Sequence, residues 1–257
     1  MKLFHALKME ENMKKFKRLP IKSIPNLRDL GGWPTPAGCT RWGVFLRSAL
    51  PGAVSAEELK FLRDYGLTTV LDFRSEAECR RAPDGLSNVP GVDYRNISMF
   101  DAAAAGGALR IEPSADFTWG THYIRMAEEK KQWMAQVVTA LARAEGCTLY
   151  HCTTGKDRAG LITALLLSVC GVKKEDIAAD YCVSQIYLRD MYREMEDAQQ
   201  LCGGDIDAPF YRTEPGAIMA FLDHLRFNHG GTESYLIHCG VDKADVERIK
   251  VRLTEKI

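Results

Sequence analysis

Residues 151–160 read His151-Cys152-Thr153-Thr154-Gly155-Lys156-Asp157-Arg158-Ala159-Gly160. An apolar run, 148–150, precedes this stretch, and a helix-like run, 161–169, follows it. The pattern predicts a strand, a tight loop and the N-terminus of a helix. Because loop amides and the helix dipole both favour negative charge, such a junction is an anion-binding site.

Two side chains give the predicted site its chemistry. Arg158 carries a planar guanidinium that can bind two phosphate oxygens and stabilise the charge of a transition state. The same positive field stabilises a thiolate, so we expect Cys152 to be a nucleophile at neutral pH. The reaction that this indicates is phosphoryl transfer to cysteine, followed by hydrolysis. The residues expected to line the phosphate are Thr153, Thr154, Gly155, Lys156 and Ala159.

The Cys-x5-Arg spacing resembles the loop of the protein tyrosine phosphatase superfamily. Its Gly-Lys-Asp-Arg core is similar to that of the atypical bacterial and fungal tyrosine phosphatases. Other motifs resemble the same family in order along the chain, so the resemblance covers most of it. They are Asn26-Leu27-Arg28-Asp29-Leu30-Gly31-Gly32, Phe45-Leu46-Arg47-Ser48, Leu71-Asp72-Phe73-Arg74-Ser75 with Glu78, and the stretch from Tyr235 to Val241.

The resemblance implies the cysteine phosphatase fold and its activity. That fold is α/β, with a mostly parallel central sheet, helices on both faces and, here, extra C-terminal helices; the alternation of strands and helices independently favours it. The implied activity is hydrolysis of phosphoric monoesters through a phosphocysteine, on phosphotyrosine and, in some members, phosphoserine, phosphothreonine or phosphoinositides. The expected partner is therefore a phosphorylated protein or a phosphoinositide. The cysteine mechanism needs no metal and no cofactor.

The leaving alkoxide or phenoxide needs a proton, so a general acid must lie near the loop. Residues 91–101 resemble the family segment that ends in a proposed general acid, which favours Asp101. Asp157 competes because it lies within the loop, beside Arg158. Asp116 is a third candidate, since it is nearer the nucleophile in sequence.

Lys156 adds a positive charge to the loop. A Gly-Lys pair also occurs in phosphoinositide 3-phosphatases, which resemble this loop only locally. We expect Lys156 to favour substrates with more than one phosphate; the alternative is a solvated surface lysine.

Ala159 departs from the family pattern. The superfamily usually has Ser or Thr directly after the arginine, and its hydroxyl helps the cysteine sulfur leave the phosphoenzyme. Its absence predicts a slow second step unless Thr154 or Thr163 replaces that hydroxyl.

Other charged residues of the motifs are expected to be structural. Internal ion pairs, or contacts that brace the loop, are predicted for Arg28, Asp29, Arg47, Asp72 and Arg74. His151 is expected to orient the loop through backbone hydrogen bonds and so help to set the thiolate pKa.

Length and composition limit the domain organisation and the other functional classes that the chain could belong to. A chain of 257 residues is expected to form one domain, residues 19–257, after a basic N-terminal tail, residues 1–18. The tail could instead form a short amphipathic helix on a membrane. Because 34 basic residues balance 34 acidic ones, the basic excess of a nucleic-acid-binding protein is missing. No apolar run reaches about 18 residues, so no stable membrane insertion is expected.

The eight cysteines indicate a reduced compartment. None forms a Cys-x2-Cys pair, and His151-Cys152 and His238-Cys239 are sequence neighbours without metal-ligand geometry, so no metal site is predicted. Without a recognisable secretion signal we expect a cytoplasmic protein, although secretion by another route stays open.

Local patterns predict the secondary structure around the loop. A hairpin is expected over 24–47, a helix with a capping box from Ser55 to Gly66, strands over 68–73, 92–97 and 148–151, a Gly/Ala-rich loop over 101–116 and helical structure over 118–143. Breaks between later helices are expected at 171–176, 202–205 and 230–231. Residues 187–200 could be a lid over the site or a solvated surface helix.

Two other functions compete with the phosphatase. A phosphate-binding pseudophosphatase would recognise phosphorylated partners, but the retained Cys152, Arg158 and candidate acids argue against it. A sulfurtransferase would use a similar loop, which the charged residues 156–158 disfavour. A nucleotide-binding loop is excluded because Asp157 stands where Ser or Thr would bind magnesium.

Overall fold

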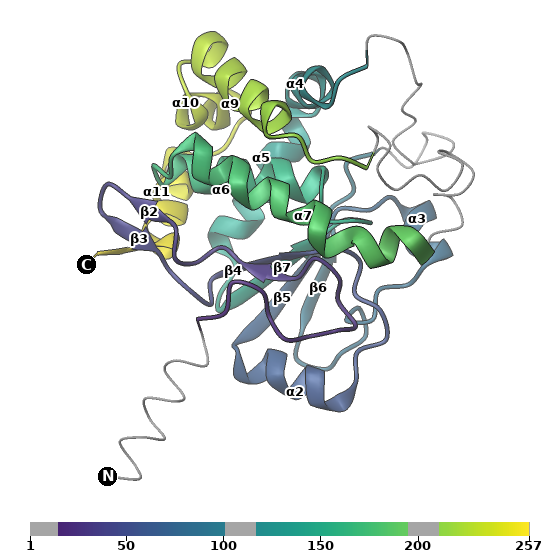
Figure 1. Cartoon of the computed structure of the whole chain (residues 1–257). Coiled ribbons are helices and arrows are strands. Elements are labelled where there is room, and N and C mark those ends of the chain that lie inside the picture. The colour runs from purple at the N-terminus through teal and green to yellow at the C-terminus, as the bar shows by residue number, and fades with distance from the viewer. Residues whose placement is uncertain (1–14, 101–116, 195–210, 257) are drawn as a thin grey trace.

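The computed structural model describes residues 15–100, 117–194 and 211–256 (Figure 1). A five-stranded sheet lies at its centre, in the order β1-β4-β7-β5-β6. These strands are β1 (Arg28–Asp29), β4 (Phe45–Ser48), β7 (Cys147–His151), β5 (Leu67–Asp72) and β6 (Asp93–Asn96). β1 pairs antiparallel with β4, whereas β4-β7, β7-β5 and β5-β6 are parallel. The predicted mostly parallel sheet is confirmed.

Helices cover both faces of the sheet, as predicted (Figure 1). Neighbouring residues along a strand point to opposite faces, so β7 buries Leu149 on one side and Tyr150 on the other. Leu149 belongs to a hydrophobic cluster that also contains Leu62 of α2. Tyr150 belongs to a second, larger hydrophobic cluster, to which helices on the opposite face contribute. The helices are α2 (Ala56–Asp64), α3 (Glu76–Arg81), α4 (Trp119–Glu129), α5 (Lys131–Arg143), α6 (Arg158–Val169), α7 (Lys174–Glu194), α9 (Pro215–His229), α10 (Thr232–His238) and α11 (Lys243–Leu253).

The single hairpin predicted over 24–47 is only partly right. β2 (Pro34–Thr35) and β3 (Gly38–Thr40) do form a tight hairpin within this range. β3 then pairs with β8 (Thr254–Lys256), near the C-terminus, and makes a second, three-stranded sheet. The strands on either side, β1 and β4, join the large sheet instead. The Asp29 carboxylate fixes this separation, because it accepts hydrogen bonds from the amides of Gly31, at 2.6 Å, and Gly43, at 2.8 Å.

The helical stretch predicted over 118–143 is two helices. Lys130 leaves the helical conformation, with φ −116° and ψ 29°, and separates α4 from α5. α4 packs on α9, whereas α5 packs on α11. The two halves of the predicted stretch therefore pack against different helices.

Several local predictions are confirmed. Ser55 and Glu58 form the predicted capping box of α2, and Gly230-Gly231 separates α9 from α10. Residues 187–194 are the end of the long helix α7. The predicted loop 101–116, the break at 202–205 and residues 195–200 lie outside the described residues.

The end of the predicted basic tail contacts the domain. Lys17 donates a hydrogen bond to the Gly31 carbonyl, at 2.7 Å, and its ammonium lies 4.1 Å from the centre of the Trp33 ring. Residues 1–14 lie outside the described residues. Within the described part of the chain, no helix combines the length and the apolar character that crossing a membrane requires.

Candidate active site

The predicted strand-loop-helix junction is present. β7 ends at His151, α6 begins at Arg158, and residues 152–157 form the loop between them. The Cys152 side chain is buried, and the Gly155 amide donates to its sulfur at 3.3 Å. Gly155 has φ +69°, and a Cβ there would lie 2.1 Å from the Ser48 carbonyl oxygen. Only glycine fits both the left-handed backbone and this close approach, so Gly155 allows the loop to close around the sulfur.

Arg158 is held in place by Glu78 from α3. Arg158 Nη1 and Nη2 donate to Glu78 Oε2 and Oε1 at 2.9 and 2.8 Å, a bidentate pair. Nη2 also lies 3.2 Å from the Thr153 hydroxyl, which itself donates to Glu78 at 2.6 Å. Glu78 also closes a capping box with Ser75 at the start of α3. One carboxylate therefore fixes the arginine, the first half of the loop and a helix terminus.

Arg158 and Glu78 each favour the ionised form of the other. Burial acts to lower the pKa of Arg158, but the neighbouring Cys152 and Glu78 outweigh it and raise that pKa. Burial likewise acts to raise the pKa of Glu78, and the Arg158 guanidinium overcomes this and lowers it to about 2. The loop thus carries a fixed positive charge beside the sulfur, as a thiolate nucleophile and a phosphate both require.

Lys156 is not the solvated lysine of the alternative interpretation, because its side chain is only 2% exposed. Its ammonium lies 3.9 Å from the centre of the Trp119 ring of α4 and 3.7 Å from Asp157 Oδ1. Burial lowers the pKa of Lys156, and Asp157 opposes that effect. Trp119 was not identified from the sequence, where it is one aromatic residue in a helical pattern.

Asp157 lies at the start of α6, with its side chain 16% exposed. Its Oδ1 accepts a hydrogen bond of 2.6 Å from the Tyr123 hydroxyl, which lies 2.7 Å from the Tyr181 hydroxyl. Burial raises the pKa of Tyr123, so the phenol stays protonated and donates. Asp101 and Asp116, the other candidate acids, lie outside the described residues.

Buried arginines brace the back of the loop. Arg47 donates to the Gly155 carbonyl at 2.5 Å and to Asp180 of α7 at 2.8 Å, and Arg28 donates to Asp180 at 3.1 Å. Burial acts to raise the pKa of Asp180, and the two arginines outweigh it and lower that pKa. This confirms the structural roles predicted for Arg28 and Arg47, whereas their shared partner, Asp180, carried no sequence signal.

The remaining motif residues are also structural. Arg74 pairs with Asp72 at 2.7 Å, as predicted. Asp29 accepts a hydrogen bond of 2.6 Å from the Tyr65 hydroxyl, besides the two amides already described, and so fixes a turn.

His151 lies between the loop and two carboxylates. Its Nδ1 is 3.1 Å from the Cys152 carbonyl oxygen, which agrees with the predicted orienting role. Its Nε2 is 2.8 Å from Asp84 Oδ2 and 3.8 Å from Asp72 Oδ2. These three buried groups could approach a metal ion together. Because Arg74 already occupies Asp72, we interpret the group as a charged support for the loop.

Neither predicted substitute for the missing hydroxyl reaches the sulfur. Thr163 donates to the Ala159 carbonyl at 2.8 Å and pairs with the Tyr150 hydroxyl at 2.7 Å. The Thr154 hydroxyl accepts from the Lys156 amide at 3.4 Å. Among the residues that the structure describes, no hydroxyl hydrogen-bonds to Cys152 Sγ.

Comparisons with known proteins identify relatives of this chain. The profile of the tyrosine phosphatase family matches residues 19–255. A tyrosine-protein phosphatase of Nostoc commune is 30% identical over 217 residues, which are 81% of this chain and 74% of that protein. A putative tyrosine-protein phosphatase of Cupriavidus necator is 31% identical over 65% of this chain and 62% of its own length. The triple specificity protein phosphatase PtpB of Mycobacterium tuberculosis is 26% identical over 90% of this chain and 98% of its own.

Proposed function

Because the chain belongs to the tyrosine phosphatase family, we propose that it hydrolyses phosphotyrosine through a phosphocysteine formed on Cys152. The observation that carries this proposal is the loop itself. The Gly155 amide points at the Cys152 sulfur, and Glu78 fixes Arg158 by two hydrogen bonds at the same loop.

In the first step the Cys152 thiolate attacks phosphorus, and the bond from phosphorus to the leaving oxygen breaks. Loop amides and Arg158 stabilise the charge on the phosphoryl oxygens. Within the described part of the chain, the Arg158 contacts use Nη1 and Nη2, which leaves Nε–H to donate to a phosphoryl oxygen. In the second step water attacks phosphorus, and the sulfur leaves as the thiolate with release of inorganic phosphate.

Asp101, Asp157 and Asp116 are the candidates for the proton donor to the leaving group. Asp157 lies at the loop, where its Oδ1 accepts a hydrogen bond from the Tyr123 hydroxyl. Leaving-group dependence separates the three. Changing the acid to Asn should lower kcat by about 10²–10⁴ on an alkyl phosphate and by less on a nitrophenyl phosphate. The aspartate whose variant shows this dependence is the donor; if none does, the proton comes from another group.

We also propose that the substrate range includes esters with more than one phosphate, such as phosphoinositides, through Lys156. Phosphoserine and phosphothreonine peptides are further candidates, since one relative is named a triple specificity phosphatase. Lys156→Ala should lower kcat/KM about tenfold more on a multiply phosphorylated phosphoinositide than on a phosphotyrosine peptide, the scale of one charge-assisted hydrogen bond. Equal losses on both substrates would exclude a discriminating role for Lys156.

We propose a cytoplasmic location; the free thiols of the seven cysteines in the described residues are those expected in a reducing compartment.

The catalytic proposal is tested with Cys152→Ser. The serine hydroxyl has no dedicated base, so turnover of a phosphotyrosine peptide should disappear while inorganic phosphate still binds, because the amides and Arg158 remain. Substantial turnover by the purified variant would contradict a covalent cysteine mechanism.

A further inference from the structure

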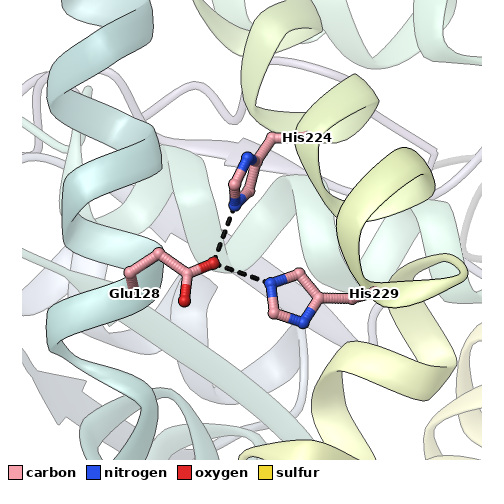
Figure 2. A group of neighbouring side chains, drawn as sticks. All are labelled: Glu128, His224 and His229. Atoms are coloured by element: carbon pink, nitrogen blue, oxygen red, sulfur yellow. Dashed lines mark hydrogen bonds and ion pairs between the residues drawn. The ribbon is translucent and has the colours of Figure 1, made fainter.

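Away from the loop, three side chains of two helices converge on one point (Figure 2). Glu128 lies near the end of α4, and His224 and His229 lie on α9. The Nε2 atoms of both histidines are 2.7 Å from the same oxygen, Glu128 Oε1. The three potential ligand atoms all lie within 4.8 Å of one another.

We propose that Glu128, His224 and His229 form a Zn²⁺ site whose fourth ligand is water. Two imidazole nitrogens and one carboxylate are a donor set that zinc takes in three-residue sites. With bonds of about 2.0–2.1 Å, tetrahedral geometry separates ligand atoms by about 3.3 Å. Each nitrogen must therefore move about 0.6 Å farther from Oε1, which small side-chain rotations achieve.

The backbone places the two rings at this point. His229 is the last residue of α9, and Gly230 follows it in the left-handed conformation, with φ 74°. The imidazole centroids of His224 and His229 are 5.6 Å apart, and the rings are inclined by 65°, so both Nε2 atoms face the carboxylate. The histidine side chains are 18% and 13% exposed and Glu128 is 36% exposed. The three side chains are therefore only partly buried, so an ion and its water can reach them from solvent.

In the metal-free protein a cation competes for the same Glu128 carboxylate. The Lys131 ammonium lies 2.6 Å from Oε2, the oxygen that the histidines do not contact. Because Lys131 is 38% exposed, it can swing into solvent when a dication arrives. Its removal should therefore strengthen zinc binding.

One rearrangement accompanies binding. The Asn228 amide nitrogen lies 3.0 Å from His224 Nδ1, so Nδ1 accepts that bond and the proton lies on Nε2. A zinc-bound Nε2 requires the proton on Nδ1, with an acceptor facing it. Asn228 is exposed, and rotation of its side chain presents the amide oxygen for this purpose.

An ion at this point would join α4 to α9. The first half of α4 carries Trp119 and Tyr123, which contact the loop residues Lys156 and Asp157. Zinc should therefore stabilise the packing of α4, the helix that contacts the loop. The proposal stands on the three ligand side chains alone and does not depend on catalysis.

The test is titration of full-length, tag-free protein with ZnCl₂ by isothermal calorimetry. The Cys152→Ser background removes the loop thiolate as a competing ligand. We expect one saturable site. Its zinc affinity should fall by about 100-fold in Glu128→Gln, His224→Gln and His229→Gln, since removing even a residue that only hydrogen-bonds to a metal ligand lowers metal affinity by 10–100-fold. His238→Gln is the matched control, because His238 is an exposed histidine whose ring lies 6.2 Å from that of His229. Lys131→Met should bind zinc about tenfold more tightly, as expected for loss of an adjacent cation.

Thermal unfolding provides a second readout. A tenfold excess of zinc over its Kd should raise the midpoint of the Cys152→Ser protein by about 3–6 °C and leave the Glu128→Gln variant unchanged. The metal-free midpoint of each variant shows whether it is folded. Absence of a saturable site, unchanged affinity in His224→Gln and His229→Gln, or an equal loss in His238→Gln would each overturn the proposal.

Discussion

Replacing Glu78 by Gln removes the negative charge that holds Arg158 and leaves the shape of the side chain unchanged. Glu78 Oε1 and Oε2 each accept a hydrogen bond from Arg158, at 2.8 and 2.9 Å, and the carboxylate is only 10% exposed. In glutamine, an NH₂ group replaces one of those oxygens. This NH₂ faces the Arg158 guanidinium, and both groups are hydrogen-bond donors. We therefore expect Glu78→Gln to lower both the stability of the domain and kcat/KM.

The size of the effect follows from linkage. Burial alone would raise the pKa of Glu78, but Arg158 brings it to about 2 from an ordinary value of 4.5. At about 1.4 kcal/mol per pH unit, this difference corresponds to about 3 kcal/mol of stability. Because the folded-state pKa is depressed, that contribution is fully present above pH 4.5 and is lost as the pH falls toward 2. About 1.4 kcal/mol should remain near pH 3.

Urea unfolding at pH 7 and pH 3 measures this difference, with Glu58→Gln as the matched control. Glu58 closes a capping box with Ser55 on α2, as Glu78 does with Ser75 on α3, but among the described residues its carboxylate pairs with backbone amides and not with an arginine. The Ser55 amide likewise lowers the pKa of Glu58 to about 2, but solvent screens this more exposed carboxylate. Glu58→Gln should therefore cost only about 1 kcal/mol, the value of a helix cap, and leave kcat/KM unchanged. Glu78→Gln should cost about 3 kcal/mol at pH 7 and reduce kcat/KM by about tenfold. Equal losses in the two variants, or a Glu78→Gln loss that is the same at both pH values, would contradict a stabilising charge interaction between Glu78 and Arg158.

Three further substitutions test other parts of the site. Gly155→Ala places a Cβ 2.1 Å from the Ser48 carbonyl oxygen at a left-handed backbone position, so kcat/KM should fall by more than about 100-fold, whereas Gly216→Ala, with open space around it, should not lower activity. Asp180→Asn leaves two buried arginines without their carboxylate, so urea unfolding should show a loss of about 3–5 kcal/mol; a loss below 1 kcal/mol would contradict this. The wild-type protein should release leaving group in a pre-steady-state burst, because Ala159 provides no hydroxyl to the departing sulfur. Ala159→Ser should shrink that burst and raise the rate of the second step by about 10–100-fold, and stopped-flow traces without a burst and without a gain would mean that the first step is limiting.

The loop could be predicted from sequence because its determinants are local. The apolar run before Cys152, the glycine within the loop and the helix after Arg158 lie within about 20 residues of one another. Capping at Ser55 is local in the same sense. Local patterns likewise predicted β5 and β7, whose buried residues form short, largely apolar runs. β4 was instead assigned to the hairpin, because its parallel partner β7 lies about 100 positions away.

The partners of the loop could not be predicted in this way. Trp119, Tyr123 and Asp180 reach the site through the packing of α4 and α7, which no short pattern encodes. The burial of Lys156 is a consequence of that packing. The proposed zinc ligands could not be found from sequence spacing, because Glu128 and His224 are 96 positions apart and meet through the packing of α4 on α9.

The most direct test of the account is to trap the phosphoenzyme. The wild-type protein is mixed with a nitrophenyl phosphate, quenched with acid within the first turnover, digested and mapped by mass spectrometry. We expect one phosphoryl group on the peptide that contains Cys152, decaying at the rate of turnover and absent from Cys152→Ser. A phosphoryl group on any other residue, or turnover without a phosphoenzyme on Cys152, would contradict the covalent mechanism.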